Sequence, residues 1–309
     1  MKGIIIYPPL FAQYVIKDRY DAFTNAISKR YGFPIIYAEN YSVPADMKVV
    51  MTMKGPQHSN PRHIVNLATV KSHQRLIGYF ADVHGGGDKF TPVLNKVFER
   101  FEYILSNSHE YLARRFPKYV DKAIYFPNFP APYPAYTTLP LNPKPIKRAL
   151  VSGYLDFGCY PLRTHVAHMK HPLVDVIKHP GNHPGPAIHN DKSKFLGARY
   201  ANKLREYGVC VTCGSHLKYM IAKYIEIMAT GALLLAPNIP DVEKAGFVAG
   251  THFIDINKEN AGEKITECVN NLDKYTSVRQ AGMVLARKNH SMAVRLQVVY
   301  NILDNIAKE

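Results

Sequence analysis

The sequence contains no tryptophan and few cysteines, and it has no apolar run near the length of a membrane-spanning helix. The four cysteines are Cys159, Cys210, Cys213 and Cys268. They are too few and too scattered for a disulfide framework in a chain of 309 residues, so we expect reduced thiols. The first apolar stretch is too short for a signal peptide and is typical of a strand. These absences favour a cytoplasmic protein without a transmembrane helix.

Acidic residues are also scarce, since 24 Asp and Glu oppose 39 Lys and Arg and give a formal net charge of +15. This charge indicates that a substrate, product or partner is anionic. Sugar nucleotides, nucleic acid and an acidic membrane surface all meet that description. The basic residues are dispersed along the chain rather than gathered in one block, which weakens the polynucleotide interpretation.

The metal-binding patterns are incomplete. No Asp-x-Asp pair is present that could hold a divalent ion against a nucleotide diphosphate. His165, His168 and His171 recur at intervals of three, but no carboxylate lies at ligand spacing among them. Cys210 and Cys213 have redox-motif spacing, yet they lie in a strand-like run and lack the second cysteine pair of a zinc site, which favours buried core cysteines. We therefore expect no bound metal.

Short apolar strands alternate with helical segments in the first half of the chain, which predicts a parallel sheet. Strands are expected at residues 4–7, 35–38, 49–53, 76–80, 103–106 and 122–126, and helices at 12–30, at 91–102 and from 107 onward. Residues 127–145 then contain seven prolines and predict a stiff extended connector.

A second alternating series follows the connector. Strands are expected from 148 and at 174–178, 209–212 and 233–236. Helices are expected after a loop that contains residues 160–163 and through residue 170, and at 195–207, 260–271, 275–288 and 292–307. Because the chain exceeds the usual size of one hydrophobic core, the two series predict two domains with a cleft between them.

Residues 223–237 form the most informative segment, because a helix, a tight turn and a buried strand follow each other within fifteen residues. Apolar side chains recur at helical spacing at Ile225, Met228 and Ala229. Gly231 stands where a left-handed C-terminal cap belongs, and residues 233–236 form a continuous apolar run.

Glu226 lies on this helix and could accept hydrogen bonds from ribose hydroxyls. We expect the N-terminal amides of the helix near residues 218–221, where unpaired donors and the positive dipole end favour a diphosphate. The alternative is a surface carboxylate paired with Lys223 or Lys218. The apolar surroundings favour a nucleotide-sugar pocket.

Asp82 and His84 directly follow the expected strand at 76–80. Ligands of open parallel sheets bind outside the carboxyl ends of strands, so either side chain could act as a general base on an acceptor hydroxyl. The alternative is a turn, in which Gly85 to Gly87 lead into a helix and Asp82 caps backbone amides.

Arg163, His216 and Lys218 are candidates for holding a diphosphate, because charge-assisted donors must offset its negative charge. Dispersed basic residues are usually solvated surface groups. Arg163 and Lys218 stand above that expectation because each lies in a loop or at a helix start beside the predicted crevice.

Several motifs together resemble the C-terminal domain of group 1 glycosyltransferases, with the spore-protein-like branch as the nearest form. They are Val151-Ser-Gly153, Tyr160-Pro-Leu-Arg163, residues 223–231 and residues 246–254. Leu105 to Ser108 and Tyr125 to Asn128 are similar to strand endings of the N-terminal domain. The resemblance implies a GT-B fold, with two Rossmann-like domains facing each other across a cleft. Residues 1–145, with 292–309 packed back on them, would bind the acceptor, and residues 146–291 the nucleotide sugar.

The resemblance also implies roles for single residues. Glu226 matches the second acid of a Glu-x7-Glu element that holds the donor ribose, whereas Lys218 takes the place of the first acid and would favour phosphate. Asp82 or His84 is similar to the catalytic position. Pro8-Pro9-Leu10 replaces the usual glycine pair after the first strand.

We therefore expect a hexosyl- or pentosyltransferase that moves a sugar from a nucleotide diphosphate, UDP rather than GDP, to a hydroxyl of a glycan. The expected reaction is inverting and needs no metal or other cofactor. The expected donor site contains Gly153, Arg163, His216, Lys218, Glu226 and the helix amides of Tyr219 and Met220. Two alternatives are a glycosyltransferase acting on modified bases of DNA, and a non-catalytic protein of this fold that binds glycans or nucleic acid.

Overall fold

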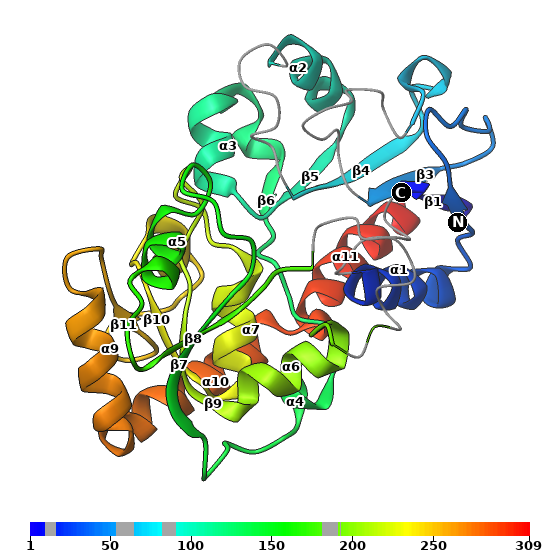
Figure 1. Cartoon of the computed structure of the whole chain (residues 1–309). Coiled ribbons are helices and arrows are strands. Elements are labelled where there is room, and N and C mark those ends of the chain that lie inside the picture. Colours follow the sequence, from blue (N-terminus) through cyan, green and yellow to red (C-terminus); the bar gives the residue numbers. More distant parts are fainter. Residues whose placement is uncertain (10–16, 54–64, 82–90, 181–190, 192) are drawn as a thin grey trace. The chain divides into compact units, whose positions relative to one another are not determined.

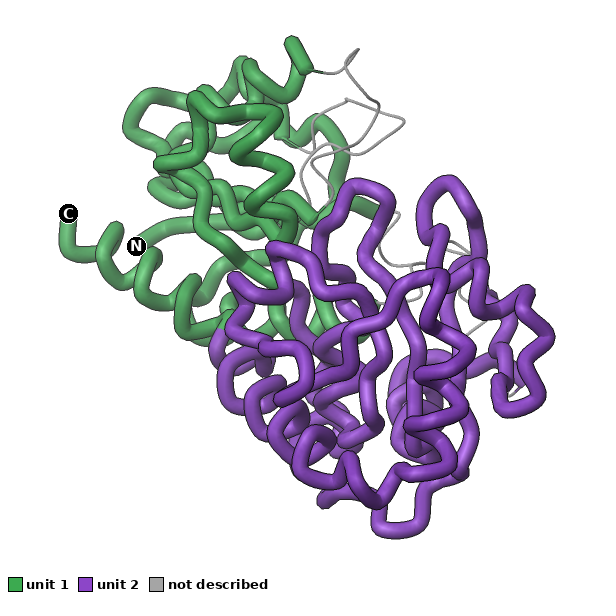
Figure 2. The backbone as a smooth tube through the Cα atoms, turned by 90° about the vertical axis from the view of Figure 1, so that its left-hand side faces the viewer, with its two compact units in different colours: residues 1–127, 295–309 green, residues 128–294 purple. Residues whose placement is uncertain are grey.

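The computed structural model describes residues 1–9, 17–53, 65–81, 91–180, 191 and 193–309 (Figure 1). These residues divide into two compact units (Figure 2). Unit 1 consists of residues 1–127 and 295–309, and unit 2 of residues 128–294.

Unit 1 contains a six-stranded parallel sheet in the order β2-β1-β3-β4-β5-β6. The strands are β1 (Gly3–Tyr7), β2 (Ile35–Tyr37), β3 (Val49–Met53), β4 (Arg75–Phe80), β5 (Tyr103–Ser106) and β6 (Ala123–Tyr125). The helices are α1 (Lys17–Tyr31), α2 (Thr91–Arg100), α3 (His109–Arg115) and α11 (Met292–Lys308), with 3-10 turns at Leu67–Thr69 and Pro117–Lys122. All residues of β1 and β3 are buried, as expected for parallel strands covered on both faces.

Aromatic side chains fill the core of unit 1. On one face of the sheet, Phe98 lies between Phe80 and Phe116, with ring centroids 5.1 and 5.0 Å away in edge-to-face geometry. The last helix, α11, packs on the first, α1. Asp304 of α11 accepts hydrogen bonds from Arg30 at 2.9 Å and from the Tyr31 hydroxyl at 2.6 Å. Residues from the two ends of the sequence therefore build one unit.

Unit 2 contains a five-stranded parallel sheet in the order β11-β10-β9-β7-β8. The strands are β7 (Ile146–Ser152), β8 (Val174–Ile177), β9 (Tyr207–Val211), β10 (Leu233–Ala236) and β11 (Ile254–Asp255). The helices are α4 (Pro134–Thr137), α5 (Pro161–His168), α6 (Gly197–Glu206), α7 (Ala222–Thr230), α8 (Pro240–Lys244), α9 (Ala261–Asn270) and α10 (Thr276–His290), with a 3-10 turn at Leu272–Tyr275. The strand order reverses between β7 and β9, so this sheet has its topological switch point there.

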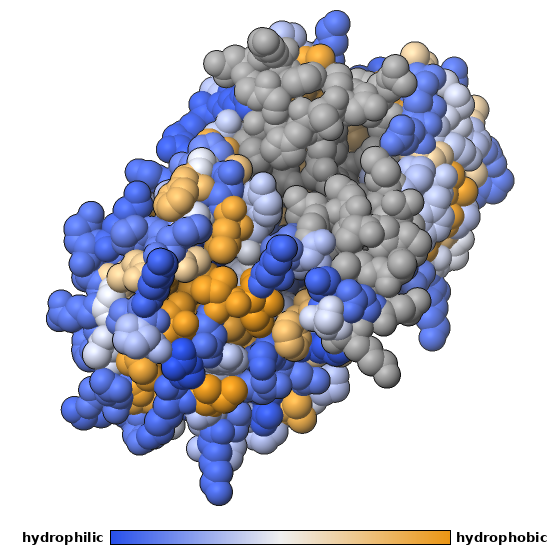
Figure 3. All heavy atoms as spheres, in the orientation of Figure 1, coloured by the Kyte–Doolittle hydropathy of each residue, from blue (hydrophilic) through white to orange (hydrophobic). Residues whose placement is uncertain are grey.

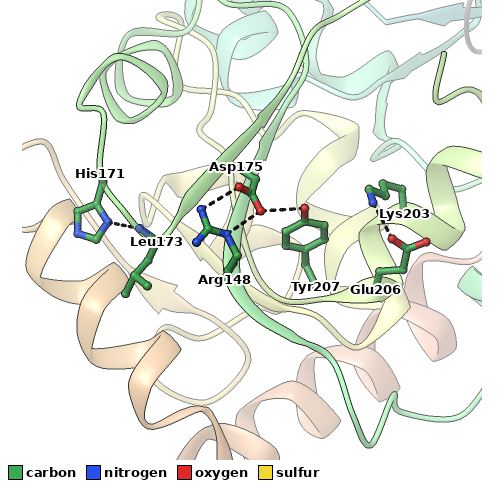
Figure 4. Close-up of polar contacts among 7 residues, drawn as sticks. All are labelled: Arg148, His171, Leu173, Asp175, Lys203, Glu206 and Tyr207. Carbon is green, nitrogen blue, oxygen red and sulfur yellow. Dashed lines mark hydrogen bonds and ion pairs between the residues drawn. The ribbon is translucent and has the colours of Figure 1, made fainter. Parts of the chain in front are cut away.

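A polar cluster ties three strands of unit 2 together (Figure 4). Arg148 of β7 donates two hydrogen bonds to Asp175 of the edge strand β8, at 2.8 and 2.9 Å. The hydroxyl of Tyr207, the first residue of β9, donates to the same carboxylate at 2.9 Å. These partners hold the pKa of Asp175 below its usual value, with the Arg148 hydrogen bonds as the main cause. The cluster fixes the edge strand on the side of the sheet away from the carboxyl ends.

The predicted mixed α/β class with two Rossmann-like parallel sheets is confirmed. Three of the expected strands, residues 49–53, 103–106 and 233–236, have the observed bounds. The helix expected at 12–30 is described from residue 17 and ends at 31. The proline-rich connector contains the short helix α4, which local pattern did not predict, and α8 was also missed. Cys210 and Cys213 are buried free thiols, as expected.

The described surface is mainly hydrophilic on the face shown in Figure 3, with apolar side chains in small patches. No helix in the described ranges has the length and apolar character needed to cross a membrane.

Candidate functional site

The candidate site lies in unit 2 at the carboxyl ends of β7 and β9, on either side of the switch point. Ser152 ends β7 and Gly153 follows it, while Thr212 follows β9. Open parallel sheets bind ligands in the crevice outside such strand ends. Helix α7, which follows β9, contributes Lys223 and Glu226.

Helix α7 is buried along most of its length because it connects two core strands. Glu226 is only 7% exposed, on a helix whose neighbouring residues from Tyr224 to Thr230 are also buried. Gly231 ends the helix in the left-handed conformation (φ 79°, ψ 13°), as predicted. The alternative of a surface carboxylate is therefore excluded, because Glu226 is buried.

The expected start of α7 was wrong by about one turn. The helix begins at Ala222, with Ile221 as its N-cap, so Lys218, Tyr219 and Met220 lie in the preceding loop. The amide of Met220 donates to the Asp241 carboxylate at 3.3 Å. The amides of Tyr219 and Met220 are therefore not helix N-terminal donors.

Lys223 occupies the first turn of α7 and points to Tyr200 of α6. Its Nζ atom donates to the Tyr200 hydroxyl at 2.7 Å and lies 4.5 Å from the centroid of that ring. The Tyr200 hydroxyl is also hydrogen-bonded to Ser152 Oγ, 2.8 Å away. Burial, and next the charge of Glu226, raise the pKa of Tyr200, so this hydroxyl stays neutral at physiological pH. Three elements, β7, α6 and α7, thus meet in one polar chain.

Gly153 allows Lys223 and Arg163 to approach the end of β7. Its φ of +109° lies in a region that side-chain-bearing residues rarely adopt. A Cβ atom there would lie 2.6 Å from Lys223 Cε and 3.1 Å from Arg163 Cζ. The predicted donor-site residues Gly153 and Arg163 are therefore in direct contact range.

Arg163 of α5 is 1% exposed, and the groups that its guanidinium bonds to or stacks on are neutral. It donates to the Tyr154 carbonyl oxygen and, at 3.5 Å, to Thr212 Oγ1, and it stacks 4.1 Å from the Tyr160 ring centroid. In the part of the chain that the structure describes, its Nε atom has no hydrogen-bond partner. No carboxylate forms an ion pair with Arg163 among these residues. A buried cation without a counter-ion is costly, so an anion placed beside Arg163 would be electrostatically stabilised.

His179 lies two residues after β8, close enough to Lys223 and Arg163 for their positive charges to affect its pKa. Burial is the main cause that lowers its pKa to about 4, and the charges of Lys223 and Arg163 lower it further. The ring of Tyr154 lies edge-on to it, with centroids 6.1 Å apart. His179 was not among the predicted site residues.

Lys218 and His216 are exposed in the loop between β9 and α7. Lys218 has a left-handed backbone (φ 60°), and its amide donates to the Ser215 carbonyl oxygen at 2.8 Å. The His216 amide donates to the carbonyl oxygen of Cys159 at 2.9 Å and so joins this loop to the one after β7. The two loops that border the switch point are therefore linked.

The candidate base residues Asp82 and His84 lie outside the described residues, so their roles stay predictions. Sequence reasoning also missed Tyr200 and Ser152, and it considered Lys223 only as a partner of Glu226. The one available signal was the motif that ends in Ser152 and Gly153. No local sequence pattern links Ser152 to Tyr200, which is 48 residues further along the chain. Among the residues described, no group of three or more His, Cys, Asp or Glu could hold a metal ion.

The two Rossmann-like units have sheet orders 2-1-3-4-5-6 and 2-1-3-4-5, each counted from its own first strand, and match the GT-B fold of solved structures. No protein-family model matches the sequence, and no curated protein matches it.

Solved structures match the whole chain. A structure of HepE from Anabaena with UDP and glucose has a TM-score of 0.62 and 10% identity, over 99% of this chain and 100% of that chain. A glycosyltransferase from Rickettsia africae has a TM-score of 0.60 and 13% identity, over 100% and 99%. An alpha-glucosyltransferase in complex with UDP-glucose and DNA has a TM-score of 0.58 and 12% identity, over 98% and 99%. At such low identity the likeness establishes the fold.

Proposed function

We propose that this protein is a glycosyltransferase that transfers a sugar from a UDP-sugar to an acceptor hydroxyl. The observation that carries the proposal is the buried Arg163 guanidinium, which has no carboxylate partner among the described residues and lies beside Lys223 at the switch point. A diphosphate would supply the missing negative charge. Glu226, one turn along α7 from Lys223, would accept hydrogen bonds from the ribose attached to that diphosphate.

The cationic side chains would act in the bond-breaking step. As the acceptor oxygen bonds to the anomeric carbon, the bond from that carbon to the diphosphate oxygen breaks, and UDP leaves with the electron pair. Lys223 would donate directly to the developing charge. Arg163 would act through its unscreened field, because solvent does not reach it. Lys218 and His216, both exposed, would extend the donor site, and no metal ion would be required.

The acceptor half of the reaction remains a prediction from sequence. We propose that unit 1 binds a glycan and that Asp82 or His84 takes the proton of the attacking hydroxyl in an inverting transfer.

The proposal of UDP rests on those neighbouring structures that were solved with UDP, with UDP-glucose or with both UDP and glucose. It is tested by isothermal titration calorimetry with UDP, GDP and uridine. We expect UDP to bind more tightly than either of the others. Glu226→Gln should weaken UDP by about 10-fold to 100-fold, since hydrogen bonds to a charged group contribute about 1.5–3 kcal/mol.

Activity is tested by the release of UDP from UDP-sugars, with and without glycan acceptors and with EDTA present. The proposal is overturned if no UDP-sugar yields UDP and if Glu226→Gln leaves nucleotide affinity unchanged. That result would favour a non-catalytic protein with this fold.

A second candidate acceptor is DNA. The formal charge of +15 favours a polyanionic partner, and a neighbour of the same fold was solved with UDP-glucose and DNA. Duplex affinity should then fall steeply with salt, because phosphate contacts release counterions, whereas affinity for a neutral oligosaccharide should hardly change. Transfer of labelled sugar to DNA would select this candidate over a glycan.

A further inference from the structure

Tyr154 is an exposed aromatic residue at the edge of the candidate site. It follows Gly153 at the carboxyl end of β7, and 49% of its surface is exposed. Its carbonyl oxygen accepts a hydrogen bond from Arg163, and its ring packs edge-on against His179. Among the described residues its hydroxyl has no hydrogen-bond partner. The side chain therefore offers both a ring and a hydroxyl to a ligand bound beside Arg163.

The loop that carries Tyr154 is fixed by its own hydrogen bonds. The Asp156 carboxylate accepts from the Cys159 amide at 2.6 Å, and the Asp156 carbonyl oxygen accepts from the Tyr160 amide at 2.7 Å. The Asp156 amide donates to Thr164 Oγ1 on α5 at 2.8 Å. Little backbone freedom is left to lose when a ligand binds, which favours a preorganised contact at Tyr154.

Tyr154 and Glu226 reach the switch point from opposite sides. In the sheet order, β9 lies on one side of β7 and the edge strand β8 on the other. Glu226 lies on α7, which follows β9, whereas the ring of Tyr154 packs on His179, which follows β8. Arg163 lies between them, against the end of β7.

The covalent structure of a nucleotide sugar matches this order. Its diphosphate joins the ribose to the transferred sugar, so the two sugars extend from opposite ends of the diphosphate. With the ribose at Glu226 and the diphosphate at Arg163, the transferred sugar extends toward Tyr154. The faces of a pyranose ring carry C–H groups that pack on an aromatic ring, and its hydroxyls can bond to a phenol.

We propose that Tyr154 binds the transferred sugar of the donor, with its ring against a C–H face of the pyranose and its hydroxyl bonded to a sugar hydroxyl. This inference rests on the proposed function, because it takes the positions of ribose and diphosphate from it. It predicts that Tyr154 contributes to the affinity for a UDP-sugar but not to the affinity for UDP.

The test is calorimetry with UDP, UDP-glucose, UDP-galactose and UDP-xylose on the wild type, Tyr154→Ala and Tyr154→Phe. Tyr154→Ala should raise the Kd of the UDP-sugar that the wild type binds most tightly by about threefold to tenfold, as expected for loss of one aromatic contact. The Kd of UDP should not change. Tyr154→Phe should retain most of the affinity for that UDP-sugar, because the ring remains.

Phe157→Ala is the matched control. Phe157 lies in the same loop and is 57% exposed, but its ring packs beside His168 of α5, with centroids 5.5 Å apart. Its removal deletes an equally exposed aromatic ring from the same loop and should leave all four affinities unchanged. Thermal unfolding shows that each variant is folded.

The outcomes separate the two ideas. If Tyr154→Ala weakens UDP as much as the UDP-sugars, the ring contacts the nucleotide, and if it changes no affinity, the ring has no ligand. Either result overturns the inference while the proposed function stands. If the wild type binds neither UDP nor any of the three UDP-sugars, the proposed function fails and the inference fails with it.

Discussion

His179 should make the stability of this protein sensitive to mild acid. Its pKa in the folded protein is lowered to about 4 from the ordinary 6.5, first by burial and then by the charges of Lys223 and Arg163. The unfolded chain therefore binds a proton at a pH where the folded protein does not. Above pH 6.5 the imidazole is neutral in both states and has no effect. As pH falls from 6.5 toward 4, protonation favours the unfolded state, and stability is lost.

The size of the effect follows from the two pKa values. At about 1.4 kcal/mol per pKa unit, the complete loss below pH 4 is about 3 kcal/mol, and about 2 kcal/mol of it is present at pH 5. Because His179 is partly exposed, these figures are upper limits. Urea unfolding of the wild type and of His179→Gln, at pH 7 and pH 5, measures the contribution as a difference between two proteins that share every other titrating group.

We expect His179→Gln to gain up to about 2 kcal/mol relative to the wild type between pH 7 and pH 5. In a Lys223→Met background the gain should shrink without vanishing, because burial remains the larger cause. A bound diphosphate should reduce it as well by offsetting the positive charges. Parallel stability curves for the two proteins, or an NMR titration that gives the His179 imidazole a pKa above 6, would refute the reasoning.

Two further substitutions test the geometry of unit 2. Gly153→Ala should lower both the melting temperature and UDP affinity, because the new Cβ meets Lys223 at a position where φ is +109°. Gly246→Ala, at φ +86° where the Cβ would meet no other part of the described chain within 4 Å, is the control for backbone strain of about 1–3 kcal/mol alone. Equal UDP affinity in the two variants would contradict the role of Gly153. Asp175→Asn should cost no more than about 1 kcal/mol at pH 7, because the carboxylate is about a third exposed beside Arg148. Since the pKa of Asp175 is lowered, this cost should begin to decline below its ordinary value of 3.8 and disappear as pH falls through the lower pKa of the folded protein. A cost that persists at still lower pH in acid denaturation curves would disprove the assignment to charge.

The sequence predicted most strands because each is a short apolar run bounded by turn residues, and such runs are buried in a parallel sheet whatever their neighbours. The run at residues 233–236 is an example. The left-handed helix end at Gly231 was predicted equally directly, because glycine favours that conformation. These features depend on local chemistry alone.

The start of α7 could not be predicted in the same way. The sequence from Lys218 to Ile221 has no helix-breaking residue, but Asp241 on α8 takes the Met220 amide, and Lys218 adopts a left-handed turn. Tyr200 was missed for a similar reason. Its contacts with Ser152 and Lys223 exist only because the fold brings these residues to the same place from separate segments. Tertiary partners of this kind leave no periodic signal.

The return of α11 to unit 1 constrains how the molecule is made. A ribosome synthesises all of unit 2 before the residues of α11 that pack against Arg30 and Tyr31 exist. During translation the surface of α1 that contacts α11 therefore stays uncovered until the end of synthesis, while unit 2 can fold earlier. A nascent chain arrested before residue 295 should bear a complete second unit and a first unit that lacks this helix.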